Sequence, residues 1–203
     1  MLKQTLTIAA LGAASLFAQA PNPTCKNCEA TYIPKSELDA YTAKEIKYGL
    51  IDLQVRDVDL GKAGVGIGMV HRGKLTKEQA QRAGLVAEHE QISEVYHIIE
   101  GEATLVTGPG LVNPKKRPAD ERTVIYQNGP GYNADSITNP QTHHLKAGDM
   151  IIIPAGTGHW FTEIPDHITY MMVRIDPDKV VPTKSQKQSE EDLKTVPAAP
   201  DKR

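Results

Sequence analysis

Two stretches of the chain hold residues that could bind a metal ion. The first, residues 87–101, reads AEHEQISEVYHIIEG and contains His89 and Glu94, five positions apart. The second, residues 148–163, reads GDMIIIPAGTGHWFTE and adds His159. Two imidazoles and one carboxylate suit a divalent transition metal and leave coordination positions open. We therefore predict that His89, Glu94 and His159 are metal ligands.

This ligand set does not select one metal. Fe(II), Mn(II), Ni(II), Cu(II) and Zn(II) all accept it, and their order of affinity alone does not choose among them. A metal with open positions can polarise a carbonyl or an enolate, activate water, or bind oxygen beside a substrate. The alternative is a protein without metal, in which His89 and Glu94 form a hydrogen-bonded pair next to a bound ligand.

The first stretch resembles the first motif of the cupin superfamily, H-x-H-x(3,4)-E-x(6)-G. His89, Glu94 and Gly101 match its second histidine, its glutamate and its glycine, and Ala87 stands in place of its first histidine. The resemblance therefore implies a site with three of the usual four protein ligands.

The second stretch resembles the second cupin motif, G-x(5)-P-x-G-x(2)-H-x(3)-N. Glu163 stands in place of the final asparagine. The resemblance implies an all-β fold, the cupin double-stranded β-helix or jelly-roll barrel, with its ligands pointing inward. The residues that match this motif are Gly148, Pro154, Gly156 and His159.

Residues on the same strand face as a ligand would line the same cavity. Tyr96 follows Glu94 by two positions and is a candidate catalytic proton donor or substrate partner, although a strand tyrosine more often packs in the core. Glu88 and Glu90 alternate to the opposite face, where we expect them to be solvated. The other residues predicted to line the cavity are Ala87, Gln91, Phe161 and Glu163.

Alternating apolar residues place the barrel at about residues 50–176. Residues 51–55 and 65–69 alternate as strands around a turn at 61–64, and residues 150–153 and 168–175 form later strands. A long insertion at about 108–142 is rich in Pro, Gly and Asn and carries the basic run 115–117. It is either a surface excursion or oligomer arm, or a lid over the barrel mouth.

The two ends of the chain differ from the barrel. Residues 1–20 have the form of a signal peptide, with Lys3, an apolar run and Ala18-Gln19-Ala20, so we expect a periplasmic or secreted protein without a membrane span after cleavage. Residues 21–49 form an arm with a short helix over 34–44. Because export implies an oxidising compartment, we predict a disulfide between Cys25 and Cys28. Residues 177–203 are rich in Pro, Lys and Gln and are predicted to be disordered.

A formal net charge of −2 gives no basic surface that would indicate a nucleic-acid partner. The expected partner is a small-molecule ligand, and a homodimer is a further expectation. The sequence supports an enzyme acting on a small oxygenated molecule by dioxygenase, isomerase, decarboxylase or lyase chemistry. The alternative is a non-catalytic cupin that binds a sugar-like ligand and has lost its metal.

Overall fold

A computed structural model describes residues 24–25, 28–82 and 84–196 of the 203-residue chain. The predicted signal peptide, residues 1–20, lies outside these ranges. Within them the chain forms mostly strands. The strands are β1 (Asp52–Asp59), β2 (Gly64–Arg72), β3 (Val86–His89), β4 (Ser93–Gly108), β5 (Gly110–Val112), β6 (Lys115–Lys116), β7 (Gly131–Ala134), β8 (Ser136–Thr138), β9 (Gln141–Lys146), β10 (Met150–Ile153), β11 (Gly158–Glu163) and β12 (Ile168–Asp176). The helices are α1 (Lys35–Tyr48), η1 (Gln79–Gln81), η2 (Val124–Asn128) and α2 (Gln186–Lys194).

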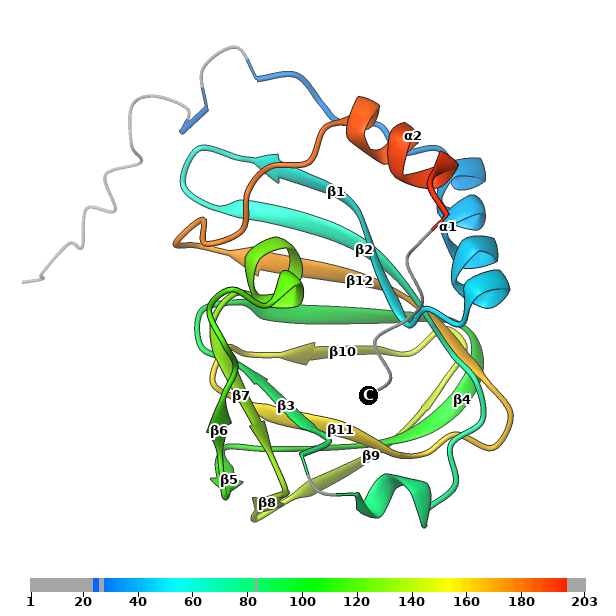
Figure 1. The fold of residues 1–203 in the computed structure, drawn as a ribbon, viewed down its shortest axis with the longest axis vertical. Helices are drawn as coiled ribbons and strands as arrows, with labels where there is room; N and C mark the ends of the chain where they lie inside the picture. The colour runs from blue at the N-terminus through cyan, green and yellow to red at the C-terminus, as the bar shows by residue number, and fades with distance from the viewer. Residues whose placement is uncertain (1–23, 26–27, 83, 197–203) are drawn as a thin grey trace, which may run out of the picture.

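One long antiparallel sheet closes around the core, in the strand order β1-β2-β12-β4-β11-β3-β7-β6 (Figure 1). Strand β4 belongs to both layers, because its first half pairs with β12 and β10 and its second half pairs with β11 and β9. Gly101 marks the bend between the halves, with a φ of 77° and no room for a side chain: a Cβ there would lie 2.0 Å from the His167 carbonyl oxygen. The motif glycine is thus required twice over, by conformation and by space.

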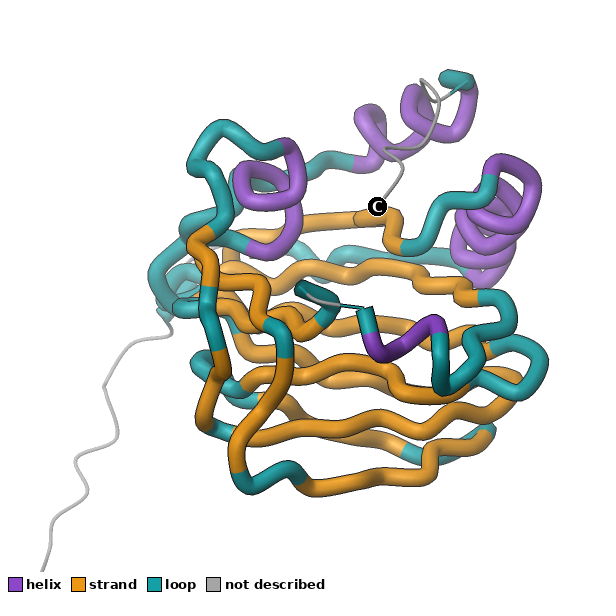
Figure 2. Tube along the Cα trace, turned by 60° about the horizontal axis from the view of Figure 1, so that its bottom comes forward, coloured by secondary structure: helices purple, strands orange, loops and turns teal. Residues whose placement is uncertain are grey.

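The inward faces of the two layers form the core. Tyr96 and Ile98 from β4 pack with Phe161 from β11 and with Tyr170 and Met172 from β12. These residues alternate with outward ones, as a strand requires. The predicted all-β cupin-type barrel is confirmed, and Figure 2 shows its strands stacked into a closed wall with the helices at the periphery.

Helix α1 packs against β1 and β2 on the outside of the barrel. It begins after Pro34 and ends at Gly49, which takes the left-handed conformation with a φ of 66°. Tyr41 and Glu45 are its buried residues, and Tyr41 packs with Val55 and Met69. The predicted helix over 34–44 therefore extends one turn further toward Gly49, whose φ stops it.

The prediction of disorder after residue 177 is wrong for residues 186–194, which form helix α2 beside α1 (Figure 1). Ser185 caps this helix in a capping box with Gln188. Ser189 is fully buried, accepts a hydrogen bond from Arg56 Nη1 at 2.6 Å, and its carbonyl accepts one from the Tyr41 hydroxyl at 3.1 Å. The amino-acid composition did not indicate this helix, because the helix docks through caps and polar contacts and not through a wide apolar face.

The insertion at 108–142 contributes to the barrel wall. Strand β7 pairs with β3, the strand that carries His89, and β6 pairs with β7. Strands β5 and β8 form a small sheet of their own. Residues 124–128 form the π-helix η2. The insertion therefore lies beside one of the predicted ligands.

Cys25 and Cys28 are paired as a disulfide, with their Cα atoms 5.8 Å apart. None of the helices in the described part of the chain has the length and apolar character that crossing a membrane requires.

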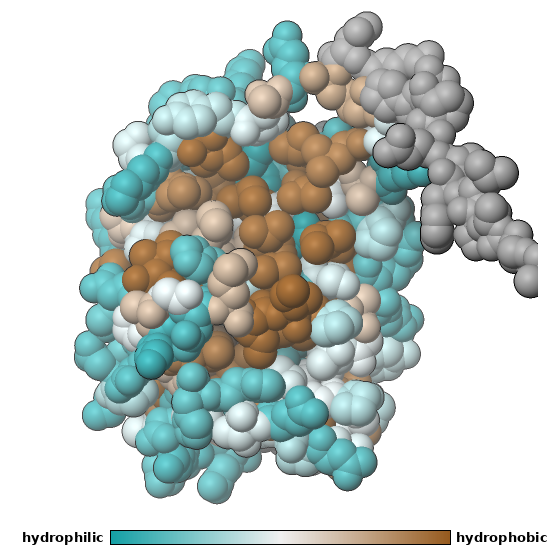
Figure 3. Space-filling view, turned by 180° about the vertical axis from the view of Figure 1, so that it is seen from behind, coloured by the Kyte–Doolittle hydropathy of each residue, from teal (hydrophilic) through white to brown (hydrophobic). Residues whose placement is uncertain are grey.

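The surface carries a broad apolar area, seen from behind in Figure 3. Exposed apolar residues stand on three strands of the barrel. Ile152 on β10 is 70% exposed and pairs with Val95 on β4, which in turn pairs with Val173 on β12. Other exposed members are Ile99, Met150 and Ile175. Areas of this kind are common at protein interfaces, and the homodimer stays a prediction.

Candidate metal centre

Three strands bring the predicted ligands together inside the barrel. His89 ends β3, Glu94 is the second residue of β4, and His159 is the second residue of β11. The turn after Pro154 is held to β3 because Gly156 N–H donates to the His89 carbonyl at 2.8 Å. The two motifs therefore meet at this turn, which fixes His159 relative to His89.

The Glu94 carboxylate lies between the two imidazoles. Its Oε1 is 3.4 Å from His89 Nε2, and its Oε2 is 3.4 Å from His159 Nε2. One ligand atom from each of the three residues lies within 4.8 Å of the other two, and all three side chains are buried. This donor set has the chemistry of a transition-metal site, and the ligand roles stay predictions.

His159 is oriented as metal-binding histidines usually are. Its Nδ1 lies 3.0 Å from the carbonyl oxygen of Thr157. Because a carbonyl only accepts, Nδ1 carries a ring proton, and the other ring nitrogen, Nε2, faces Glu94. Tyr96 donates its hydroxyl to Glu94 Oε2 at 2.8 Å and so orients the carboxylate. Glu94 and His159 therefore fit a bound metal.

Nδ1 of His89 faces a hydrogen-bond donor, whereas Nδ1 of His159 faces an acceptor. Arg117, from the insertion, lies with Nη2 3.0 Å from His89 Nδ1. A guanidinium only donates, so Nδ1 accepts and the proton of the neutral ring lies on Nε2, the atom that faces Glu94. His89 is in place for a metal, but with a proton on the ligand atom.

A second buried arginine balances the charge of Glu94. Arg174 on β12 is the cross-strand partner of Glu94, with its Nε 3.5 Å from Glu94 Oε1. It also donates to Asp52 and Gln54. Gly68 on β2 makes room for it, because a Cβ there would lie 3.1 Å from Arg174 Nη1. Buried charges are found paired in this way because an isolated one is costly to desolvate.

Burial and neighbouring charges shift two pKa values at the centre. Burial, followed by the charges of His159, Arg117 and Arg174, lowers the pKa of His89 well below its ordinary value, so the ring is neutral at neutral pH. Burial and the charge of Glu94 raise the pKa of Tyr96 well above its ordinary value, so its hydroxyl stays protonated and can donate to Glu94.

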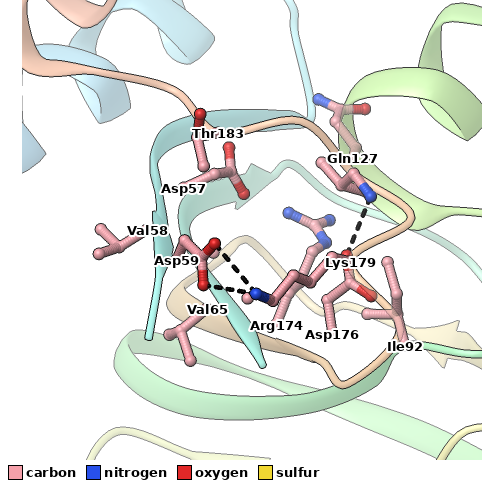
Figure 4. Close-up of a pocket in the computed structure, with 13 residues that line it drawn as sticks. Asp57, Val58, Asp59, Val65, Ile92, Gln127, Arg174, Asp176, Lys179 and Thr183 are labelled. Atoms are coloured by element: carbon pink, nitrogen blue, oxygen red, sulfur yellow. Dashed lines mark hydrogen bonds and ion pairs between the residues drawn. The ribbon is translucent and has the colours of Figure 1, made fainter. Parts of the chain in front are cut away.

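A small cavity lies on the other side of Arg174 (Figure 4). Its wall includes Asp57, Ile92 and Gln127, so it lies between β1, the start of β4 and the helix η2 of the insertion. At about 40 Å³ it is much smaller than the roughly 150 Å³ that hold a benzene molecule. The cavity is large enough for water molecules but too small for an organic ligand.

Two of the four residues predicted to line the cavity face the barrel interior. Ala87 is the direct cross-strand partner of His159, so the two side chains leave the sheet on the same face. Phe161 is buried in the core, with its ring 5.9 Å from that of Tyr170.

The predictions for Gln91 and Glu163 are wrong. Gln91 lies in the turn between β3 and β4, where the strand alternation stops, and it bonds Asp178 at the surface. A bulge between Phe161 and Glu163 turns Glu163 outward, where it pairs with Lys77 at 3.3 Å. Glu88, expected to be solvated, is instead 5% exposed, and its cross-strand neighbour on β7 is Tyr132.

Sequence reasoning missed the two arginines. Arg174 had a signal, because it continues the inward series of Tyr170 and Met172, and a charged residue at an inward position needs a partner. No sequence signal distinguishes Arg117 from Lys115 and Lys116. The two lysines are exposed and the arginine is buried, although all three lie in the same basic run.

Comparisons with known proteins return solved structures only. No protein-family model and no curated protein matches the chain. A cupin protein from Bacteroides fragilis is 14% identical over 76% of this chain and 89% of its own, with a TM-score of 0.35. An RmlC-like cupin family protein from Methanocaldococcus jannaschii, described as a double-stranded β-helix, is 14% identical over 64% and 84%, with a TM-score of 0.33. Hydroquinone 1,2-dioxygenase from Sphingomonas is 10% identical over 58% and 62%, with a TM-score of 0.36.

At these identities and TM-scores the similarities carry no argument about substrate or reaction, since one fold hosts many functions. The assignment of the fold rests on the chain itself. Its two motifs lie on adjacent strands, its motif glycine bends the strand shared by both layers, and its three predicted ligands point to one place inside the barrel. This chain has the fold of the cupin superfamily.

Proposed function

We propose that this chain is an exported cupin that binds a divalent transition metal through His89, Glu94 and His159 and acts on a small oxygenated molecule. One observation carries the proposal. His159 Nε2 and His89 Nε2 each lie 3.4 Å from an oxygen of the Glu94 carboxylate, and all three side chains are buried. Two imidazole nitrogens and a carboxylate gathered in this way can bind one divalent cation.

Each surrounding residue then has a defined task. Thr157 holds the ring proton of His159 on Nδ1, Tyr96 orients the Glu94 carboxylate, and Arg174 balances its charge from the other side. A bound metal would supply Lewis-acid chemistry for a carbonyl, an enolate or a water molecule. The role of Tyr96 as a catalytic proton donor stays a prediction, since its hydroxyl already donates a hydrogen bond to Glu94.

Titration with Zn²⁺ tests the metal site. The protein, first freed of metal by dialysis against a chelator, is expected to bind one equivalent. His159→Ala removes a ligand and should lose that equivalent. His144→Ala removes an exposed histidine that bonds Thr104 on β4 and should keep it. Equal binding by the His159→Ala variant and the unmodified protein would rule the site out.

The second candidate is a metal-free barrel that binds a small ligand, and the contact of Arg117 with His89 favours it. Under this proposal no variant of the three ligands changes Zn²⁺ binding, while the protein still binds a small molecule. Export stays part of both proposals and is checked by fractionating cells that express the full chain: the mature protein should leave the cytoplasm.

A further inference from the structure

Arg117 is built into the wall of the candidate metal centre. Its side chain is 7% exposed, although it follows two exposed lysines. Its Nη2 donates to the Glu88 carbonyl at 2.6 Å and lies 3.0 Å from His89 Nδ1. Its Nη1 lies 3.4 Å from Asn133 Oδ1. The guanidinium is therefore held by β3 and β7 together.

A glycine clears the space that Arg117 occupies. A Cβ on Gly131 would lie 2.3 Å from Arg117 Nη2 and 2.1 Å from the Glu88 carbonyl oxygen. Gly131 is not among the glycines with positive φ, so its backbone conformation does not require glycine. The close approach of the chains and of the guanidinium does require it. The packing around Gly131 is therefore adapted to the position that Arg117 takes beside His89.

The contact determines which nitrogen of His89 is free. A metal at the centre needs the lone pair of Nε2, with the ring proton on Nδ1. With Arg117 in place, that arrangement would set an N–H of the guanidinium against an N–H of the imidazole at 3.0 Å. His159 has no such conflict, because its Nδ1 faces a carbonyl. Nδ1 thus accepts a hydrogen bond in His89 and donates one in His159.

We propose that Arg117 controls the metal affinity of the centre by holding His89 in the tautomer that does not ligate. The inference rests on the proposed metal site and adds a positioning residue to it. Metal binding through all three residues requires Arg117 to leave His89, which couples loading of the centre to a movement of the Arg117 side chain. With Arg117 in place, only Glu94 and His159 are ready to ligate.

The test compares Arg117→Gln with Lys116→Gln by Zn²⁺ titration. Both changes remove one positive charge from neighbouring positions. Arg117→Gln removes the donor at His89 and supplies an amide whose oxygen can accept. Lys116 instead pairs with Glu90 at the surface, at 3.2 Å, and does not contact the centre. Changes to the outer partners of ligating histidines typically alter affinity about 10–100-fold. We expect Arg117→Gln to bind Zn²⁺ about 10–100-fold more tightly, and Lys116→Gln to match the unmodified protein.

Two controls separate this inference from the metal site itself. His159→Ala in the Arg117→Gln background should abolish the gain. If His159→Ala weakens binding but Arg117→Gln does not tighten it, the role of Arg117 is wrong and the metal site stands. If His159→Ala leaves binding unchanged in both backgrounds, the proposed metal site fails.

A spectroscopic measurement decides the tautomer without a variant. In the metal-free protein, two-dimensional ¹H–¹⁵N correlation through the imidazole ring distinguishes a proton on Nδ1 from one on Nε2. We expect His89 to carry its proton on Nε2 and His159 on Nδ1. A proton on Nδ1 of His89 would overturn the proposal, even if Arg117→Gln proved too unstable to purify.

Discussion

Glu45→Gln should stabilise the protein increasingly as the pH rises. Glu45 lies in α1 with 0% of its surface exposed. Burial, followed by the charge of Asp52, raises its pKa from the ordinary value of 4.5 to about 10. The folded protein therefore keeps this carboxyl neutral across the physiological range, while the unfolded chain ionises it above about pH 4.5. Because the folded pKa is the higher of the two, Glu45 contributes its full stability below the unfolded pKa of about 4.5. As the pH rises from there to the folded pKa, this contribution to the free energy of unfolding is progressively lost.

The magnitude follows from the two pKa values. Each pH unit between them costs the folded protein about 1.4 kcal/mol relative to a side chain that does not titrate. From pH 5 to pH 8 the free energy of unfolding of the unmodified protein should therefore fall by about 4 kcal/mol relative to that of Glu45→Gln. This difference needs only a folded pKa above 8. Asp57, whose pKa burial raises to about 6, titrates in both proteins and cancels.

Urea unfolding at pH 5, 6, 7 and 8 measures this difference. Glu190→Gln, at an exposed position of α2, is the matched control and should follow the unmodified protein at every pH. If the stabilities of Glu45→Gln and the unmodified protein run parallel from pH 5 to pH 8, Glu45 is not a buried neutral acid and the reasoning is refuted.

Three further predictions concern the site, the disulfide and the surface. Ala87→His places an imidazole beside His159, so we expect tighter Zn²⁺ binding in titration and lower or redirected turnover in any assay that detects turnover; unchanged binding would mean that position 87 does not face the metal. Replacing Cys25 and Cys28 with serine should leave metal binding unchanged, and thiol titration of the exported protein should find no free thiol; two reactive thiols would contradict the disulfide. If the broad apolar area around Ile152 forms a homodimer interface, sedimentation should give twice the chain mass for the unmodified protein and the chain mass for Ile152→Lys. A monomeric unmodified protein would show that this area is not a homodimer interface.

The convergence of His89, Glu94 and His159 could be predicted because the two stretches resemble the cupin motifs, and the resemblance implies a barrel with its ligands pointing inward. The glycine at Gly101 and the proline turn at Pro154 lie where those motifs have them. Glu163 could not be placed, since a single bulge after Phe161 turns the next residues to the other face. Strand alternation predicts orientation only as long as the ladder is regular.

The contacts that tune the site could not be predicted from the sequence. Arg117 is 28 positions from His89, in an insertion whose composition indicates only turns and charge. Helix α2 was missed for a related reason, because its burial depends on Ser189 meeting Tyr41 and Arg56 from elsewhere in the chain. Contacts between distant polar residues leave no periodic pattern, so local sequence does not reveal them.

Anomalous diffraction at the zinc edge, from crystals soaked in Zn²⁺, tests the central claim most directly. The metal site predicts one strong peak inside the barrel, about 2.0–2.2 Å from His159 Nε2 and from a carboxylate oxygen of Glu94. With His89 also bound, Arg117 should have left His89 Nδ1. Strong peaks at surface residues with none among His89, Glu94 and His159 would contradict the claim that this barrel holds a metal.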